Sequence, residues 1–136
     1  MEITEDQKRS IATLARKHGL SLVVLFGSQA TGKTHKESDV DIGVIAGEHF
    51  DYREAYAVEG ELAPILKRRD AEVVNLRRVS PLLLMRAVQK GKVLHEEHPG
   101  TLVRLKVAAL RRYVETAPLR RMEAPRLEHF LKKHGR

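Results

Sequence analysis

Apolar residues recur along this chain with two different periods, and these separate helical from extended segments. At the N-terminus a capping box at Thr4 and Gln7 precedes apolar residues at helical spacing, which predicts a helix over 5–18 that ends at Gly19. The apolar run 20–26 is short and β-branched in its middle, which favours a buried strand. Residues 39–46 alternate in the way that a second strand requires.

The same two periods continue through the rest of the chain. An apolar stripe predicts a helix over 52–69, with a kink or break at Pro64. Ser80 followed by Pro81 provides an N-cap with proline at the first helical position, so a helix is predicted to run to Lys90 and stop at Gly91. The remaining expected elements are a helical turn over 28–31, a polar loop over 33–38, strands over 71–76 and 93–95, a helix over 101–115, an interruption at Pro118 and Pro125, and a helix over 127–133.

This order of elements defines the expected fold class. Helices and strands alternate along most of the chain, but the strands are too short for a full doubly wound sheet. We therefore predict an α/β (α+β) fold with a small mixed β-sheet backed by helices. With 136 residues the chain has room for one domain, predicted over 1–98, and a basic helical extension over 99–136.

The charge of the chain is concentrated near its C-terminus. Residues 1–100 contain 15 Lys/Arg and 15 Asp/Glu, whereas residues 101–136 contain 10 Lys/Arg and 3 Asp/Glu, which accounts for the whole net charge of +7. A basic segment on a neutral body predicts an acidic partner, either nucleic acid or an acidic protein surface, with a solvated helix face that aids solubility as the alternative. The chain has no cysteine and no apolar run of membrane-spanning length, so we expect no disulfide, no thiolate metal site and no membrane contact, and a cytoplasmic location.

Two short motifs carry the candidate chemistry. Asp39 and Asp41 lie at alternate positions of one predicted strand, so their carboxylates project from the same face and repel each other unless a cation lies between them. Mg²⁺ prefers such oxygen ligands and completes its shell with water and substrate phosphates. The preceding turn offers backbone N–H groups at Gly27 and a hydroxyl at Ser28, which a phosphate can approach. Together these residues predict a site for a nucleoside triphosphate and a metal ion.

The same motifs resemble a known signature. Leu25-Phe26-Gly27-Ser28, followed after about ten residues by Asp39-Val40-Asp41, is similar to the signature of the minimal nucleotidyltransferases of the DNA polymerase β-like superfamily. The resemblance covers about residues 8–97 and implies the palm-like fold of that superfamily. It also implies that Gly27 and Ser28 hold the triphosphate of ATP, and that Asp39 and Asp41 ligate Mg²⁺.

The resemblance leaves a third carboxylate to be assigned. The family pattern has an aspartate on the strand after the long helix, and Glu72 occupies the aligned position here. We predict that Glu72 is the third metal ligand and helps to activate the attacking hydroxyl, with Asp70 as the rival and neither residue as the remaining alternative. Lys33 is a candidate for contact with triphosphate oxygens, and Arg77 and Arg78 are candidates for contact with a phosphate or a partner.

The C-terminal segment carries a second resemblance. Residues 112–120 are similar to the tail of antitoxins that are paired with HEPN-domain ribonuclease toxins. This resemblance implies a partner toxin that the chain neutralises by transferring AMP from ATP to a tyrosine hydroxyl. Two alternatives remain open from the sequence: a non-catalytic antitoxin that covers its toxin, and a nucleotidyltransferase that acts on RNA ends.

Overall fold

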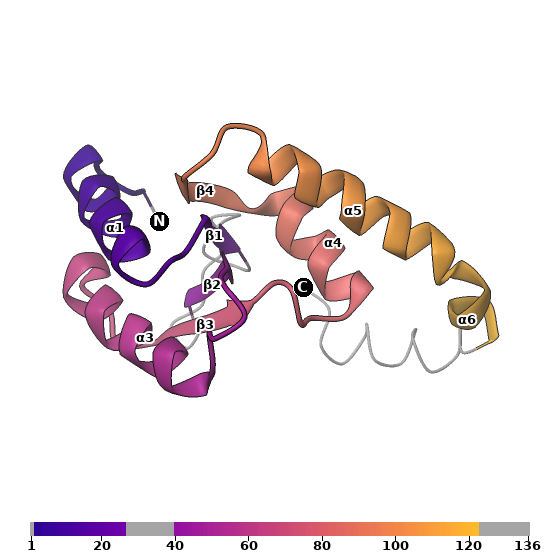
Figure 1. The fold of residues 1–136 in the computed structure, drawn as a ribbon, viewed down its shortest axis with the longest axis horizontal. Helices are drawn as coiled ribbons and strands as arrows, with labels where there is room; N and C mark the ends of the chain where they lie inside the picture. Colours follow the sequence, from indigo (N-terminus) through magenta and orange to yellow (C-terminus); the bar gives the residue numbers. More distant parts are fainter. Residues whose placement is uncertain (1, 27–39, 123–136) are drawn as a thin grey trace.

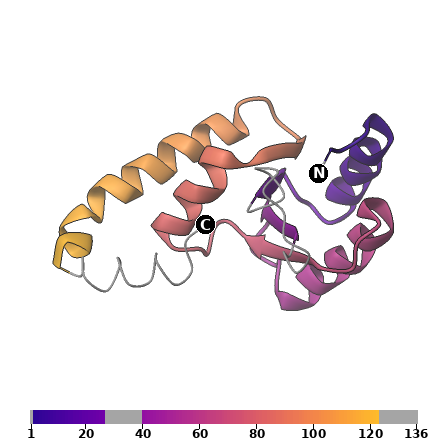
Figure 2. The ribbon, with the colours of Figure 1, turned by 180° about the vertical axis from the view of Figure 1, so that it is seen from behind.

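A small β-sheet lies between two layers of helices (Figure 1). The computed structural model describes residues 2–26 and 40–122. Helices α1 (Glu5–Lys17) and α3 (Tyr52–Leu66) cover one face of the sheet. Helix α4 (Pro81–Lys90) covers the other, and α5 (Thr101–Glu115) packs along α4, as Figure 2 shows from behind. The strands are β1 (Leu22–Phe26), β2 (Val40–Ile45), β3 (Ala71–Asn75) and β4 (Lys92–Glu96), and a short helix α6 (Ala117–Met122) follows α5.

The sheet is mixed, as the sequence predicts. Its strand order is β3-β2-β1-β4, in which β1 pairs antiparallel with both β2 and β4 while β2 pairs parallel with β3. The parallel pair requires a crossover connection, and α3 supplies it. The resulting topology places β3 at one edge of the sheet and β4 at the other.

The layer formed by α1 and α3 is fixed by local signals and by polar contacts. The capping box of α1 is present, since the Gln7 backbone N–H donates to Thr4 Oγ1 (3.1 Å) and the Thr4 N–H donates to Gln7 Oε1 (2.8 Å). The side-chain amide of Gln7 also donates to the Ile65 carbonyl (3.0 Å) and so ties α1 to the end of α3. Gly19 takes the left-handed conformation that was predicted for the end of the helix (φ 68°).

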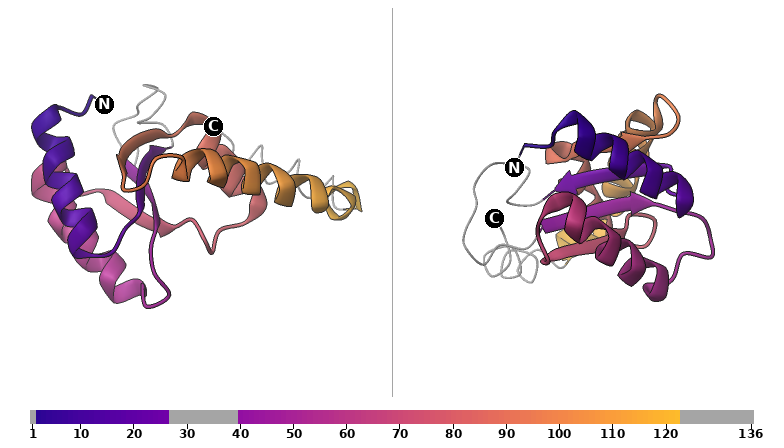
Figure 3. Two further views of the ribbon diagram at one scale, coloured as in Figure 1. Left: turned by 45° about the horizontal axis from the view of Figure 1, so that its top comes forward. Right: turned by 90° about the vertical axis from the view of Figure 1, so that its left-hand side faces the viewer.

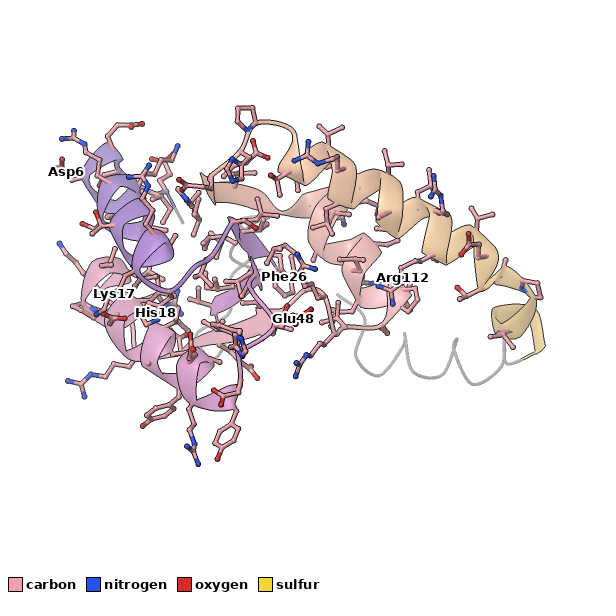
Figure 4. The ribbon with its side chains drawn as sticks, in the orientation of Figure 1. Asp6, Lys17, His18, Phe26, Glu48 and Arg112 are labelled. Atoms are coloured by element: carbon pink, nitrogen blue, oxygen red, sulfur yellow. The ribbon has the colours of Figure 1, made fainter. Side chains whose placement is uncertain are left out.

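A carboxylate on α3 receives two cationic groups from the end of α1. Lys17 Nζ and His18 Nε2 both contact Glu61, and Figure 4 shows Lys17 and His18 beside α3. These contacts, the hydrogen bond from Lys17 first and that from His18 second, lower the pKa of Glu61 below its usual value. The layer is therefore held by polar contacts at its surface as well as by its apolar core.

In the layer formed by α4 and α5, helix α4 begins with the predicted N-cap. The Ser80 hydroxyl accepts from the Leu83 N–H (3.2 Å), and Pro81 occupies the first helical turn, where its missing N–H is not needed. Gly91 joins α4 to β4 at a point where a side chain does not fit. A Cβ at Gly91 would lie 2.3 Å from both the Ala87 carbonyl oxygen and Val24 Cγ1. Glycine at this position therefore lets α4 pack directly on β1.

Two predicted boundaries are wrong by two or three residues. The first strand begins at Leu22 rather than residue 20, because the Leu20 N–H closes the end of α1 by donating to Ala15 O (2.7 Å). Helix α3 ends at Leu66 rather than 69, because Lys67 adopts the left-handed conformation (φ 58°). Pro64 lies inside α3 and the helix ends two residues after it.

Proline behaves differently after α5. Pro118 was predicted to interrupt the helix, but the interruption lies at Thr116, and Pro118 lies in the first turn of α6, where proline is tolerated. Pro125 lies outside the described residues. The predicted elements over 28–31, 33–38 and 127–133 lie outside the described residues.

Candidate active site

The register of three strands brings two of the predicted site residues together. Asp41 on β2 lies opposite Phe26 on β1 and opposite Glu72 on β3. Paired residues on neighbouring strands project from the same face, and the strands are about 4.8 Å apart, so the Asp41 and Glu72 side chains are neighbours. Figure 4 labels Phe26, the last residue of β1, near the middle of the molecule.

Alternation along β2 decides which face carries these carboxylates. Val40, Ile42 and Val44 are fully buried against α1 and α3, so Asp41 projects from the opposite face. Asp41 is half-buried and Glu72 is exposed. The same face carries Gly43, where a Cβ would lie 2.8–2.9 Å from the Leu76 side chain, so Leu76 packs directly on the backbone next to the site.

The rival carboxylate, Asp70, has a different environment. It lies just before β3 and forms a two-point ion pair with Arg68, in which Nε donates to Oδ1 (2.9 Å) and Nη2 to Oδ2 (2.6 Å). The hydrogen bond from Arg68 is the main reason that the pKa of Asp70 lies below its usual value. Among the described residues Glu72 has no such partner, so its carboxylate remains available to a ligand.

The other predicted residues divide into those that lie elsewhere and those that are not described. Arg77 and Arg78 lie in the turn after the far end of β3, whereas Glu72 lies near the beginning of that strand. The structure therefore does not bring these arginines to the carboxylates. Gly27, Ser28, Lys33 and Asp39 lie outside the described residues, and their roles stay predictions. Within residues 2–26 and 40–122, no cluster of three or more acidic or histidine side chains is close enough to hold a metal ion.

An open groove borders Glu72 and contains residues that sequence reasoning did not place at the site. It has a volume of about 560 Å³, lies between α3 and the outer edge of β3, and is lined by Tyr52, Arg53, Ala55, Tyr56, Glu59, Glu72 and Val73. The two tyrosines are 76% and 78% exposed. The sequence places these tyrosines one helical turn apart and off the apolar stripe of α3, which indicates that they are exposed. It does not indicate that a groove beside β3 lies next to them.

Glu59 occupies the backbone edge that faces this groove. Its carboxylate Oε1 accepts a hydrogen bond from the Val73 N–H at 2.9 Å. Because β3 is the last strand of the sheet, this N–H would otherwise lack a strand partner. At Val73 the backbone edge beside the groove is therefore capped by Glu59, whereas the Glu72 side chain is exposed.

Comparison with known proteins identifies the family. The family model described as polymerase beta, nucleotidyltransferase matches residues 8–99. The chain belongs to this family. The curated relatives include a protein adenylyltransferase MntA of Shewanella oneidensis, 37% identical over 75 residues, and one of Aphanizomenon flos-aquae, 28% identical over 142 residues. The first match spans 55% of this chain and 53% of the relative, and the second spans 98% and 95%.

Solved structures with the same fold include toxin–antitoxin complexes. A toxin–antitoxin structure with AMP-PNP aligns with a TM-score of 0.75 at 28% identity, covering 89% of this chain and 98% of the other. A tri-AMPylated Shewanella oneidensis HEPN toxin in complex with its MNT antitoxin aligns with a TM-score of 0.71 at 25% identity, covering 91% and 98%. The predicted minimal nucleotidyltransferase fold and the predicted kinship with HEPN-paired antitoxins are thereby confirmed.

None of the helices within residues 2–26 and 40–122 has both the length and the apolar character needed to cross a membrane.

Proposed function

We propose that this chain transfers the AMP group of ATP to a hydroxyl of a HEPN-domain toxin and so acts as its antitoxin. The observation that carries the proposal is the register of Asp41 with Glu72, which places two carboxylates side by side where β1 leads into the Gly27-Ser28 motif. The names of the curated relatives support transfer to a protein, and the solved complexes support a HEPN toxin as the acceptor and ATP as the donor.

The reaction is a displacement at the α-phosphorus. The acceptor hydroxyl oxygen forms a bond to that phosphorus while the bond to the oxygen bridging to the β-phosphorus breaks. Pyrophosphate leaves with the electron pair, and the hydroxyl proton passes to the Glu72 carboxylate. Gly27, Ser28 and Lys33 hold the triphosphate, so the chain contributes mainly position and charge complementarity.

The donor set of the site fits Mg²⁺. Asp41 and Glu72 present carboxylate oxygens from adjacent strands, and hard cations take oxygen ligands. Asp39, Asp41 and Glu72 would hold the ion, which when bound neutralises charge on the triphosphate. Asp70 takes no part in this set, because Arg68 engages both of its oxygens. The cytoplasmic location expected from the sequence stays a prediction.

Transfer of labelled AMP from ATP to the toxin tests this proposal. We expect labelled AMP to appear on the purified toxin when the chain, ATP and Mg²⁺ are present, and Asp41→Asn to lower the rate by at least about 100-fold. Asp6→Asn is the matched control, because Asp6 is an exposed carboxylate on α1. Neutralisation of the toxin with no label transfer would instead support the non-catalytic antitoxin, and extension of RNA ends would support the RNA-directed enzyme.

A second pair of variants separates the rival carboxylates. Glu72→Gln and Asp70→Asn make the same chemical change two positions apart. We expect the first to lower transfer by about 100-fold or more at unchanged stability, and the second to keep transfer while lowering the thermal midpoint through loss of the Arg68 ion pair. The reverse result would assign the third carboxylate to Asp70.

A further inference from the structure

Helix α5 has two apolar faces, and only one of them is used within the described chain. Leu102, Leu105 and Ala109 belong to the same core cluster as α4. A second stripe remains exposed: Val103 is 63% exposed, Val107 55%, Leu110 53% and Val114 60%. We call these four residues the α5 seam. Four large apolar side chains on one exposed stripe are typical of an interaction surface, because such clusters are uncommon on free surfaces.

The spacing of the seam residues indicates which kind of secondary structure can cover them. Its members are separated by four, three and four residues, which is the repeat of the core positions of a coiled coil. A helix that lies along α5 buries all four side chains at once, whereas a loop or a strand does not match this repeat. The partner segment is therefore a helix with its own apolar stripe.

Basic side chains border the seam on both sides. In this heptad repeat, Arg104 and Arg111 directly follow Val103 and Leu110 on one flank of the seam. Lys106 directly precedes Val107 on the other flank, and all three basic side chains are exposed. The described part of the chain supplies no ion pair to any of them, and within it the Arg104 guanidinium donates a hydrogen bond to Thr101 Oγ1 at 3.3 Å. Flanking positions of this kind set the choice of partner through charge.

These flanks disfavour a second copy of this chain as the partner. In a parallel pair of α5 helices, the flank that carries Lys106 in one copy lies against the flank that carries Arg111 in the other, so these two cations meet. In an antiparallel pair, Arg104 meets Arg111 across the same flank. Both arrangements place like charges together beside the buried seam, which is destabilising. An RNA partner would match the charge, but it would leave the valine and leucine stripe without apolar contacts.

We propose that the α5 seam docks an amphipathic helix of the toxin, with an apolar stripe flanked by Asp or Glu residues. This inference rests on the proposed function, from which the toxin is taken as partner. The seam lies on α5, which extends away from the sheet (Figure 3), whereas the paired carboxylates lie on β2 and β3. Docking and AMP transfer therefore use different elements, and one can fail without the other.

The chain offers a direct way to observe the seam, because it contains no cysteine. A single Val107→Cys substitution adds one thiol within the seam, and Ala108→Cys adds one at the exposed neighbouring position, outside it. We expect a thiol reagent to modify both variants rapidly in the free chain. Saturating toxin should slow modification of Val107→Cys at least tenfold and leave Ala108→Cys within about twofold.

Any other segment or molecule that covers the seam gives a different pattern of thiol modification, and each such pattern overturns the proposal. Slow modification of Val107→Cys in the dilute free chain would mean that a segment of this chain covers the seam. Protection that rises with the concentration of the chain alone would indicate a second copy. Protection by an RNA oligonucleotide, or no protection by saturating toxin, would also exclude a docked toxin helix.

Affinity measurements provide the second readout. Val107→Asp and Ala108→Asp add the same charge to adjacent exposed positions, so they share any cost to the helix. We expect the first to weaken toxin binding at least tenfold in calorimetry and the second to leave it within about twofold. Equal affinities would contradict the proposal. Label transfer measured on the same samples keeps the two hypotheses apart, because protection of Val107→Cys without AMP transfer supports docking and rejects the enzymatic function.

Discussion

The two helical layers of this molecule differ in how completely they use their apolar surface. Helices α1 and α3 bury their stripes against the sheet and add polar ties, such as the hydrogen bond from Gln7 to Ile65 and the contacts of Glu61. Helix α5 buries one stripe beside α4 and leaves a second one exposed. The first layer therefore mainly stabilises the fold, and the second also offers a surface to a partner.

The largest expected effect distinguishes a core leucine from a seam leucine. Leu62 on α3 is fully buried, whereas Leu110 on α5 is 53% exposed. We expect Leu62→Ala to lower the free energy of unfolding by about 3 kcal/mol, because it removes buried contacts and leaves a cavity. The same substitution at Leu110 should change it by no more than about 0.5 kcal/mol. Denaturant unfolding measures both, and equal losses would show that the seam is part of the folded core.

A second pair of variants tests the close approach of α4 to β1. We expect Gly91→Ala to cost about 2 kcal/mol, since the new methyl group meets both Val24 Cγ1 on β1 and the Ala87 carbonyl oxygen at 2.3 Å. Gly60 lies within α3 with nothing within 4 Å of an added Cβ, so Gly60→Ala should stabilise the chain by about 0.5–1 kcal/mol. Thermal unfolding of the two variants gives opposite shifts if this packing is correct.

The capping box of α1 gives a smaller effect. Thr4→Ala removes the side-chain acceptor for the Gln7 N–H, and we expect a loss of about 1 kcal/mol in the free energy of unfolding. Thr4→Ser keeps the hydroxyl and should recover most of this loss. A serine variant as unstable as the alanine variant would mean that the methyl group, rather than the hydrogen bond, is responsible.

The smallest expected effect is the dependence of stability on pH through Glu61. The pKa of Glu61 is lowered in the folded state, so its contribution to stability is present above its unfolded pKa and is lost as the pH falls through its folded pKa. Glu61→Gln lacks this contribution at every pH. We therefore expect the stability difference between the two proteins to shrink as the pH is lowered from neutral into the acid range, measured by urea unfolding at a series of pH values. A difference that stays constant would assign the effect to packing.

The sequence predicts most of this fold because its signals are local. The cap at Ser80-Pro81 and the limits of α5 were placed correctly from adjacent residues. The ion pair between Arg68 and Asp70 was not predicted, because it depends on the bend that precedes β3. The pairing of Asp41 with Glu72 also depends on register across a crossover, which no local pattern determines. Likewise, the two apolar stripes of α5 have similar periodicity, and only the fold shows which one is covered.

The contact between Glu59 and Val73 has a consequence for the behaviour of the chain in a crowded cell. The Val73 amide lies at the middle of the border strand β3, and a carboxylate already occupies it. A foreign strand that adds to the sheet there has either to displace that carboxylate from the Val73 N–H or to bury its charge. The molecule thus keeps an open groove beside Glu72 while resisting the strand-by-strand stacking that bare strand edges invite.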